Sequence, residues 1–342
     1  MRMNEIQTDA ELTAFMTEPS GKLVNFMKVL KGDIVGLGAT GKMGIELIET
    51  IVRADRLAGR KRRITVASTF SNPENMRYLK GLGVKTQQGD LSDDSFLNKC
   101  ADAENVFFMA GFKFGSSADY KKAFRMNVLL PYLVGKKYKH SKIVVFSSCN
   151  IYPHTDPKKG GSRESTPLDP KGIYGWTVLG RENAFNIISD KFGTKACLYR
   201  LAYAQHLKYG VLIDIAKLVY AGKPVYAPLP YVNLISQRDA NEAAIRCLAL
   251  CENPPKPLNI SGNSASVRCI ASKMGLLMGK KAVIMEPKAK LSMLGNDNLA
   301  KRLLGPYRDK QSEMIEAAAN WIRSGGSDWN KPTGFASAEH KY

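Results

Sequence analysis

A glycine-spaced turn between an apolar strand and a helix constrains this 342-residue chain more than any other feature. Glycines stand at positions 38, 41 and 44 in a GxxGxxG pattern, and Gly36 adds an overlapping GxGxxG. An apolar run precedes the turn, and helical periodicity follows it at Ile45, Leu47, Ile48 and Ile51. Such glycines permit a tight turn and let backbone N–H groups at a helix N-terminus approach a pyrophosphate closely.

Strands and helices alternate after this turn, which predicts an α/β fold: a doubly wound, parallel, Rossmann-type sheet with a smaller C-terminal substrate lobe. We expect further strands at 64–68, 84–87, 105–111, 142–148 and 195–201, and helices at 44–56, 72–79, 118–134 and 174–191. The predicted parts are a helical extension (1–30), a dinucleotide-binding domain (31–203), a mainly substrate-binding lobe (204–325) from which strands could return to the main sheet, and a loose tail (326–342).

Composition excludes several classes of protein. The chain is 44% hydrophobic and 24% charged, as in an ordinary soluble globular protein, and no apolar run reaches the roughly 18 residues that span a membrane. The N-terminus carries no secretory apolar region. Six scattered cysteines without a CxxC pair, and only four histidines, argue against a zinc site or a disulfide framework. We expect a cytoplasmic protein with no metal.

The formal charge of +19 leaves two interpretations open. The densest basic runs are Arg53, Arg56, Arg60, Lys61, Arg62 and Arg63, and then Lys136, Lys137, Lys139 and Lys142. They could form a nucleic-acid patch, or a solvated surface that attracts phosphorylated ligands generally. We favour the second, because neither run is interleaved with the aromatic residues that stack on single-stranded nucleic acid.

Six short motifs follow the predicted elements in order. They are the glycine turn, Gly89-Asp90-Leu91, Met109-Ala110-Gly111, Asn127-Val128, Ser147-Ser148 with Tyr152 four residues on, and Tyr174 before a helix carrying Arg181-Glu182. Together they resemble the extended short-chain dehydrogenase/reductase superfamily, specifically its NAD-dependent epimerase/dehydratase family, over approximately residues 32–320.

The resemblance implies an NAD or NADP cofactor. The residues expected to hold it are Gly38, Thr40, Gly41, Lys42, Met43, Gly44, Ser68, Asp90, Leu91, Met109, Ala110, Gly111, Lys113, Asn127, Ser147 and Tyr174. Asp90 either accepts a hydrogen bond from the adenine amino group or caps a turn with Ser92. Lys113 lies in a loop that is similar to one from which a lysine reaches the cofactor in sugar-nucleotide epimerases. Asn127 is expected to tie its helix to the loop after the fourth strand.

The resemblance also implies that Ser148 and Tyr174 are catalytic, the tyrosine exchanging a proton with substrate while the serine orients the reacting oxygen. The family places a lysine four residues after the tyrosine, which lowers the phenol's pKa from about 10. Here that position is Val178. Three explanations stay open: another cation substitutes, with Lys113 best placed; the charge of the oxidised nicotinamide suffices; or dehydrogenase chemistry has been lost.

The second strand bears on the choice of cofactor. It ends Val66-Ala-Ser68-Thr-Phe-Ser71, without the Asp or Glu that accepts the ribose 2′-hydroxyl of NAD. The repulsion that would exclude a 2′-phosphate is therefore missing, and Ser68, Ser71 and Arg77 could accept NADPH. We lean towards NADP over NAD.

The resemblance implies a sugar, a sugar nucleotide or a related polyhydroxylated carbonyl compound as substrate, contacted by Ser148, Cys149, Asn150, Tyr203, Asn233 and Arg238. His206 is a further acid–base candidate, although a lone loop histidine is more often structural. A homodimer formed by the helices at 118–134 and 174–191 is also expected. One competing hypothesis is a non-catalytic member of the superfamily that binds dinucleotide or RNA. Another is a lysine-free enzyme that carries out elimination or isomerisation with a permanently bound cofactor.

Overall fold

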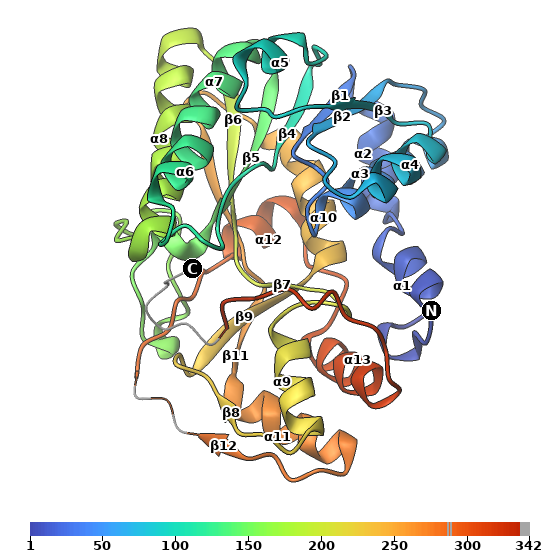
Figure 1. The fold of residues 1–342 in the computed structure, drawn as a ribbon, viewed down its shortest axis with the longest axis vertical. Coiled ribbons are helices and arrows are strands. Elements are labelled where there is room, and N and C mark those ends of the chain that lie inside the picture. Colours follow the sequence, from blue (N-terminus) through green and yellow to red (C-terminus); the bar gives the residue numbers. More distant parts are fainter. Residues whose placement is uncertain (286, 288, 336–342) are drawn as a thin grey trace.

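The protein is built on a seven-stranded parallel sheet with helices on both faces (Figure 1). The computed structural model describes residues 1–285, 287 and 289–335. The strand order is β10-β6-β5-β4-β1-β2-β3. The bounds are β1 Ile34–Leu37, β2 Ile64–Ser68, β3 Lys85–Gln88, β4 Asn105–Phe108, β5 Lys142–Ser148, β6 Lys195–Leu201 and β10 Lys256–Ile260. The order reverses between β1 and β4, as in a doubly wound fold, so the predicted fold class is confirmed.

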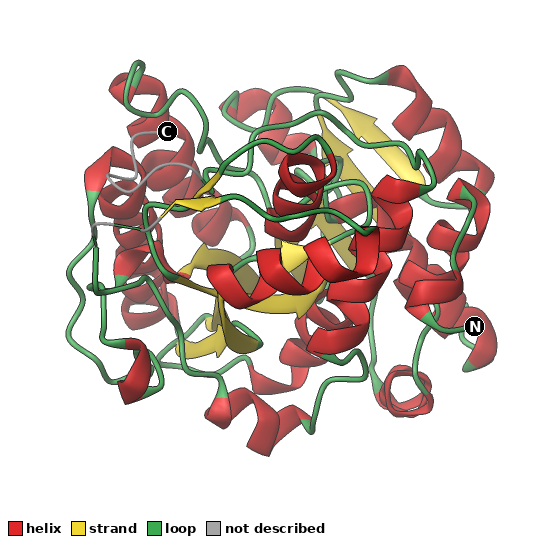
Figure 2. Cartoon of the chain, turned by 90° about the horizontal axis from the view of Figure 1, so that it is seen from below, coloured by secondary structure: helices red, strands yellow, loops and turns green. Residues whose placement is uncertain are grey.

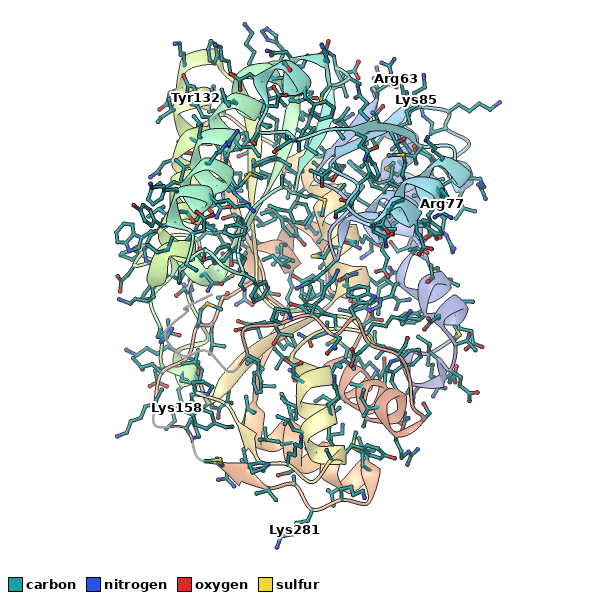
Figure 3. All side chains as sticks on the ribbon, viewed as in Figure 1. Arg63, Arg77, Lys85, Tyr132, Lys158 and Lys281 are labelled. Atoms are coloured by element: carbon teal, nitrogen blue, oxygen red, sulfur yellow. The ribbon has the colours of Figure 1, made fainter. Side chains whose placement is uncertain are left out.

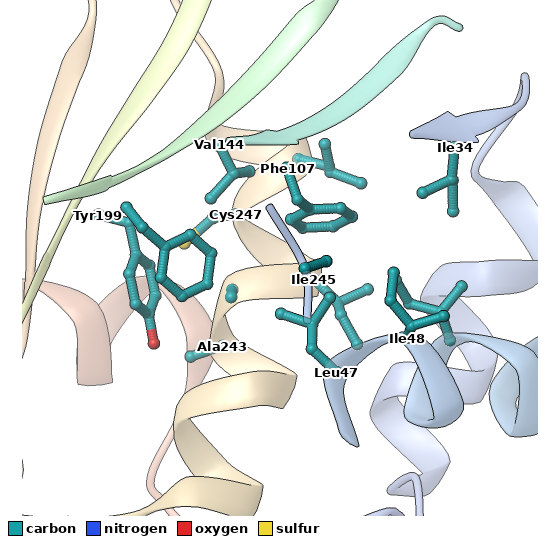
Figure 4. Close-up of a cluster of buried hydrophobic side chains, with 14 of the residues drawn as sticks. Ile34, Leu47, Ile48, Phe107, Val144, Tyr199, Ala243, Ile245 and Cys247 are labelled. Atoms are coloured by element: carbon teal, nitrogen blue, oxygen red, sulfur yellow. The ribbon is translucent and has the colours of Figure 1, made fainter. Parts of the chain in front are cut away.

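Apolar side chains fill both faces of the inner part of this sheet, which is why β1, β2, β4 and β5 are buried along almost their whole length. One face packs against α2 (Gly21–Val29), α3 (Gly44–Leu57), α4 (Pro73–Gly81) and α10 (Gln237–Arg246). Figure 4 shows Phe107, Val144 and Tyr199 of three strands meeting Ile48 of α3 and Ile245 of α10. The other face is covered by α5 (Asp94–Lys99), α7 (Leu130–Lys137) and α8 (Gly172–Phe192).

A second, smaller lobe has its own core. Helices α9 (Val211–Tyr220), α11 (Val267–Met278) and α13 (Gln311–Arg323) pack around short strands, and α1 (Asp9–Met16) joins them (Figure 1). Figure 2 shows the chain from below, with helices surrounding the strands. The strands form a sheet of β11 (Asn263–Ser266), β9 (Tyr231–Ser236) and β7 (Ala204–Gln205), and a pair of β8 (Val225–Tyr226) with β12 (Ile284–Met285). Within 204–325, β10, α10 and α12 (Asn298–Leu304) return to the main core, as the sequence allowed.

Short helices mark departures from regular structure. The helix predicted at 118–134 is α6 (Tyr120–Phe124), a π-helical turn η2 (Arg125–Leu129) and then α7. A π-helical turn inside a helix often lies at a functional site, and this one carries Asn127. Unlike η2, the segments η1 (Met3–Glu5), η3 (Cys149–Ile151), η4 (Pro157–Lys159) and η5 (Cys247–Leu250) are 3₁₀ turns.

The end of the chain folds back across the molecule. In Figure 1 the dark red segment after α13 crosses between the two lobes. We call residues 327–335 the crossing segment. Trp329 stacks on His206, Phe335 is buried in the small lobe, and the Pro332 carbonyl accepts a hydrogen bond from Lys42 Nζ at 3.3 Å. The prediction of a loose tail is wrong for these residues, while 336–342 lie outside the described residues.

In the part of the chain that the structure describes, no helix is both long enough and apolar enough to cross a membrane.

Candidate functional site

The glycine turn has the shape of a phosphate cradle. Gly38 has a positive φ of 72°, and a Cβ there would lie 2.7 Å from Cα of Ala110. A Cβ on Gly44 would lie 2.5 Å from the Ala39 carbonyl, whereas one on Gly41 would meet nothing within 4 Å. Neighbouring backbone therefore packs closely against Gly38 and Gly44, whereas the space beside Gly41 is open. Helix α3 begins at Gly44. This geometry fits a pyrophosphate at the helix N-terminus.

The structure gathers most of the predicted cofactor residues at the carboxyl edge of the sheet, along with this turn. Ser68 ends β2, and its Oγ lies 2.6 Å from Oγ1 of Thr40. Met109 and Ala110 follow β4 half-buried, and Gly111 is exposed. Met43 is the residue before α3 and is also half-buried.

Asp90 and Leu91 lie at the end of β3. Leu91 is buried, whereas Asp90 is exposed and its Oδ1 accepts a hydrogen bond from the Ser92 backbone N–H at 2.8 Å. The capping arrangement with Ser92 is therefore present, although the helix cap itself is Asp93. The adenine contact stays a prediction.

Asn127 makes the predicted tie between its helix and the loop after β4. Its Oδ1 accepts from the Phe112 backbone N–H and its Nδ2 donates to the Phe112 carbonyl, each at 2.8 Å. Nδ2 also reaches Oγ1 of Thr177 on α8 at 3.0 Å. One buried amide thus fixes the loop that precedes Lys113 and positions it against α8.

Ser148 and Tyr174 meet where β5 ends and α8 begins. The Ser148 hydroxyl lies close enough to the Tyr174 phenol to influence its pKa, and Ser148 Oγ donates to Asn150 Oδ1 at 2.9 Å. Burial raises the pKa of the Tyr174 phenol, and the charge of Arg181 and the Ser148 hydroxyl oppose that rise. Ser147 faces the other way and donates its hydroxyl to Glu182 at 2.5 Å.

Two lysines and three aromatic rings form a row that includes Tyr174. Lys113 Nζ lies 5.2 Å from the centre of the Tyr174 ring and 5.5 Å from that of Phe114. Lys42 Nζ lies 4.9 Å from the Phe114 ring and 3.8 Å from the Tyr209 ring. Burial lowers the pKa of Lys113 to about 7 and that of Lys42 to about 8, and the crowding of positive charges acts in the same direction.

Val178 stands where the family that the sequence resembles has lysine. The side chains around it are apolar too. It is fully buried in a cluster with Cys149, Ile151 and Tyr152. One turn further along α8, the guanidinium of Arg181 donates to Asn127 Oδ1 at 2.9 Å and to the Phe146 carbonyl. Arg181 belongs to one of the six motifs, but the motif alone predicts no role for it. Its spacing of seven residues from Tyr174 places both side chains on one face of the helix, and this spacing could have indicated that Arg181 belongs to the site.

The predicted substrate residues separate into two groups. Cys149 and Asn150 are buried beside Ser148, and burial raises the pKa of the Cys149 thiol to about 12, which suits a packing role. Tyr203 is half-buried at the end of β6. Asn233 donates instead to the carbonyls of Gly262 and Gly295, and Arg238 is paired with Asp309. The structure therefore gives Asn233 and Arg238 internal partners.

His206 is also held by internal contacts. Its Nε2 lies 2.9 Å from Oε1 of Glu46, and its ring stacks on Trp329 with centres 4.5 Å apart. Its Nδ1 accepts from the Lys208 backbone N–H, which assigns the Nε2–H tautomer to the neutral ring. These contacts favour the structural role.

A cavity of about 670 Å³ opens beside the glycine turn. Its walls include Thr40, Lys42, Ser71, Arg77, His206 and Trp329. Arg77 projects from α4 (Figure 3). Two carboxylates in the cavity wall are paired with basic side chains: Glu46 with His206, and Glu49 with Arg53.

The first basic run is partly neutralised. Arg62 is buried against Asp55 at 2.7 Å, and Arg53 and Arg63 pair with Glu49 and Asp33. Arg63 lies at the edge of the sheet away from the glycine turn (Figure 3). This pairing supports a solvated surface more than a nucleic-acid patch.

Comparison with known proteins agrees with this architecture. The sequence model described as "NAD dependent epimerase/dehydratase family" matches residues 34–207. UDP-glucuronic acid 4-epimerase from Bacillus cereus, solved with UDP-glucuronic acid and NAD, is similar with a TM-score of 0.68 at 16% identity, over 85% of this chain and 99% of that one. The UDP-glucose 4-epimerase of Thermus thermophilus, solved with NAD, gives a TM-score of 0.68 at 18% identity, over 85% and 99%. No curated protein matches the chain significantly.

Proposed function

Because this chain belongs to the NAD dependent epimerase/dehydratase family, a family of enzymes, we propose that it transfers hydride between an NAD(P) cofactor and a sugar nucleotide or a related polyhydroxylated compound. The observation that carries the proposal is the Ser148–Tyr174 pair, which lies at the same edge of the sheet as the glycine cradle. The similar solved structures support a sugar-nucleotide substrate, because their titles name UDP-sugar 4-epimerases.

Each residue of the pair has a distinct task. As a substrate hydroxyl is oxidised to a carbonyl, the Tyr174 phenolate takes the hydroxyl proton; the proton returns to the oxygen when the carbonyl is reduced. Ser148 holds that oxygen through its own hydroxyl. The glycine turn would hold the dinucleotide, which would accept hydride from the substrate carbon and return it; return to the opposite face would invert that carbon.

For the cofactor we infer NADP. Ser68 and Thr40 bond to each other at the end of β2, where a carboxylate would select NAD. The adjoining cavity presents Lys42 and Arg77, and Arg77 makes no hydrogen bond or ion pair with any residue that the structure describes. These cations would attract a 2′-phosphate.

The experiment combines cofactor binding with turnover. The full chain is titrated with NADH and NADPH by fluorescence, and then incubated with UDP-glucose, UDP-galactose and UDP-glucuronic acid while products are separated by chromatography. We expect NADPH to bind more tightly. Tyr174→Phe should lower the rate about 10²- to 10⁴-fold, while Tyr132→Phe, on α7, serves as the matched control.

Two outcomes would contradict the proposal. One is the absence of binding for both dinucleotides. The other is a Tyr174→Phe variant that turns over as fast as the parent chain.

The buried Val178 favours one alternative, a member of the family that binds dinucleotide or RNA without turnover. Tight NADPH binding with no conversion of any sugar nucleotide would support this alternative. An RNA affinity that falls steeply with salt would identify the RNA-binding form.

We also propose a homodimer in the cytoplasm. Tyr120 and Phe124 of α6, Leu129 of η2, and Trp176 and Ile187 of α8 are large apolar residues that are 49–57% exposed. Their helices contact one another on one side of the molecule (Figure 1). An apolar face of this kind suits a self-complementary interface. The six free thiols suit a reducing compartment.

A further inference from the structure

Arg181 is a buried cation at the edge of the candidate active site. Only 5% of the residue is exposed, and it projects from α8 towards the carboxyl ends of β4 and β5. Its guanidinium donates to Oδ1 of Asn127 and to the carbonyl of Phe146, and lies 5.5 Å from the Phe108 ring. These acceptors are neutral, so they orient the guanidinium without cancelling its charge.

The neighbouring carboxylate is already paired elsewhere. Glu182 accepts hydrogen bonds from both Nε and Nη2 of Arg200, at 3.0 and 2.6 Å, and from Ser147. Among the described residues, no carboxylate lies within ion-pair distance of Arg181, and its Nε has no hydrogen-bond acceptor. A buried guanidinium without a counter-ion is costly, because removing a charge from water is unfavourable. A transient anion nearby would offset that cost.

The guanidinium also borders the place where the cofactor is expected. A Cβ on Gly111 would collide with Nη2 of Arg181. Arg181 stands seven residues after Tyr174, so both side chains project from one face of α8. The position between them, where the family has lysine, is Val178, buried among apolar side chains.

We propose that Arg181 takes over the electrostatic role of the absent lysine: its charge stabilises the Tyr174 phenolate, while its hydrogen bond to Asn127 fixes the loop beside the cofactor. The proposal rests on the proposed function in one respect, that Tyr174 is the acid–base group. Arg181 is a positioning residue, because it acts on the substrate through Tyr174.

Lys113 is the competing source of positive charge. Among the residues that the structure describes, the ionisable groups facing Tyr174 are Lys113 from the loop after β4, Arg181 from α8 and Tyr209 before α9. Burial lowers the pKa of Lys113 to about 7, so this amine loses its charge in the range where a phenolate forms. Burial lowers the pKa of Arg181 as well, but a guanidinium starts from a much higher pKa than an amine and stays charged over a wider range. Of these described groups, Arg181 is therefore the cation that remains when the tyrosine ionises.

The test measures the pKa of Tyr174 directly and needs neither substrate nor cofactor. The full chain carries tyrosine labelled with carbon-13 at Cζ, and the Tyr174→Phe variant identifies the signal of Tyr174 in an NMR pH titration. Arg181→Gln keeps amide donors for Asn127 and Phe146 but removes the charge, whereas Arg181→Lys places an amine in the same buried position, where burial should discharge it as it does Lys113. We expect Arg181→Gln to raise the Tyr174 pKa by about one unit or more, and Arg181→Lys to raise it as well.

Matched variants separate the possible causes. Lys113→Met should leave the titration of Tyr174 nearly unchanged, and Arg60→Gln, at an exposed residue of the main domain, controls for net charge. A folded Arg181→Gln variant with the parent pKa overturns the proposal, as does a Lys113→Met variant that produces the whole rise. If Arg181→Gln does not fold, a folded Arg181→Lys variant with the parent Tyr174 pKa overturns it instead. Failure to bind NADH or NADPH contradicts the proposed function but leaves this titration unaffected.

Discussion

At the scale of single residues, burial decides which groups around Tyr174 carry charge. Lys113 is held among the rings of Phe114 and Tyr174, and burial lowers the pKa of its ammonium to about 7. In the unfolded chain the same amine titrates near 10.4. Between these two values the unfolded state binds more protons than the folded state.

This difference gives a prediction about pH. Since stability rises with pH wherever the unfolded state binds more protons, the free energy of unfolding should gain a rising contribution from about pH 7 to pH 10. Each unit of pKa difference corresponds to about 1.4 kcal/mol. Lys113→Met should remove this rise and be more stable than the parent chain at pH 7, as measured by urea unfolding across that range.

The control is Lys121→Met, which removes an exposed lysine of α6. It should keep the slope of the parent chain. A Lys113→Met variant with that same slope would show that Lys113 does not lose its charge on folding.

Among the elements, α8 does most to join the site to the sheet. Glu182 in its middle accepts from Ser147 of β5 and from Arg200 of β6. Arg200 in turn donates to the hydroxyl of Tyr152, which donates to Asn259 of β10. One buried network therefore fixes α8, and with it Tyr174, against three neighbouring strands.

Removing the Arg200 side chain should therefore lower the free energy of unfolding substantially. Arg200→Met leaves Glu182 buried without a counter-ion, which typically costs about 3–5 kcal/mol. Lys256→Met is the matched control, because it breaks the partly exposed Lys256–Glu252 pair and should cost less than about 1 kcal/mol. Equal losses in urea unfolding would mean that the Glu182–Arg200 pair contributes no more than a surface pair.

Local patterns explain why most of these elements were predictable. The strands at 64–68, 142–148 and 195–201 have the predicted bounds, because each is a short β-branched or apolar run between turn residues. The π-helical turn around Asn127 was not predictable, since it depends on bonds from Asn127 to Phe112 and Thr177, up to 50 residues away.

Only those residues of the candidate site that belong to recognisable motifs could be predicted from the sequence. Gly38, Ser148 and Tyr174 could be located, and the absence of lysine at 178 could be seen. The charge of Arg181 matters because of burial and of a partner 54 residues away, which no local pattern encodes. Likewise Arg238 looks available in the sequence, but in the fold it pairs with Asp309 across 71 residues.

For the whole molecule, the apolar face of α6, η2 and α8 leads to a prediction about assembly. Trp176 and Ile187 are three turns apart on one side of α8, beside the exposed Leu129. Leu129→Glu combined with Trp176→Glu should bury like charges in the proposed interface and halve the mass measured by sedimentation equilibrium.

Leu276→Glu is the control, because Leu276 is 85% exposed on α11 in the other lobe. It should leave the mass of the dimer unchanged. A parent chain that sediments as a monomer at high concentration would exclude the homodimer.

The crossing segment has a consequence for movement between the lobes. Asp328 pairs with Lys217 of the small lobe, while the Pro332 carbonyl accepts hydrogen bonds from Lys42 of the glycine turn and from Tyr209. The crossing segment thus links the small lobe to the glycine turn at the wall of the adjoining cavity. If the proposed dinucleotide is exchanged by separation of the lobes, these bonds must break first, and their lifetime would limit how often the cofactor could be renewed.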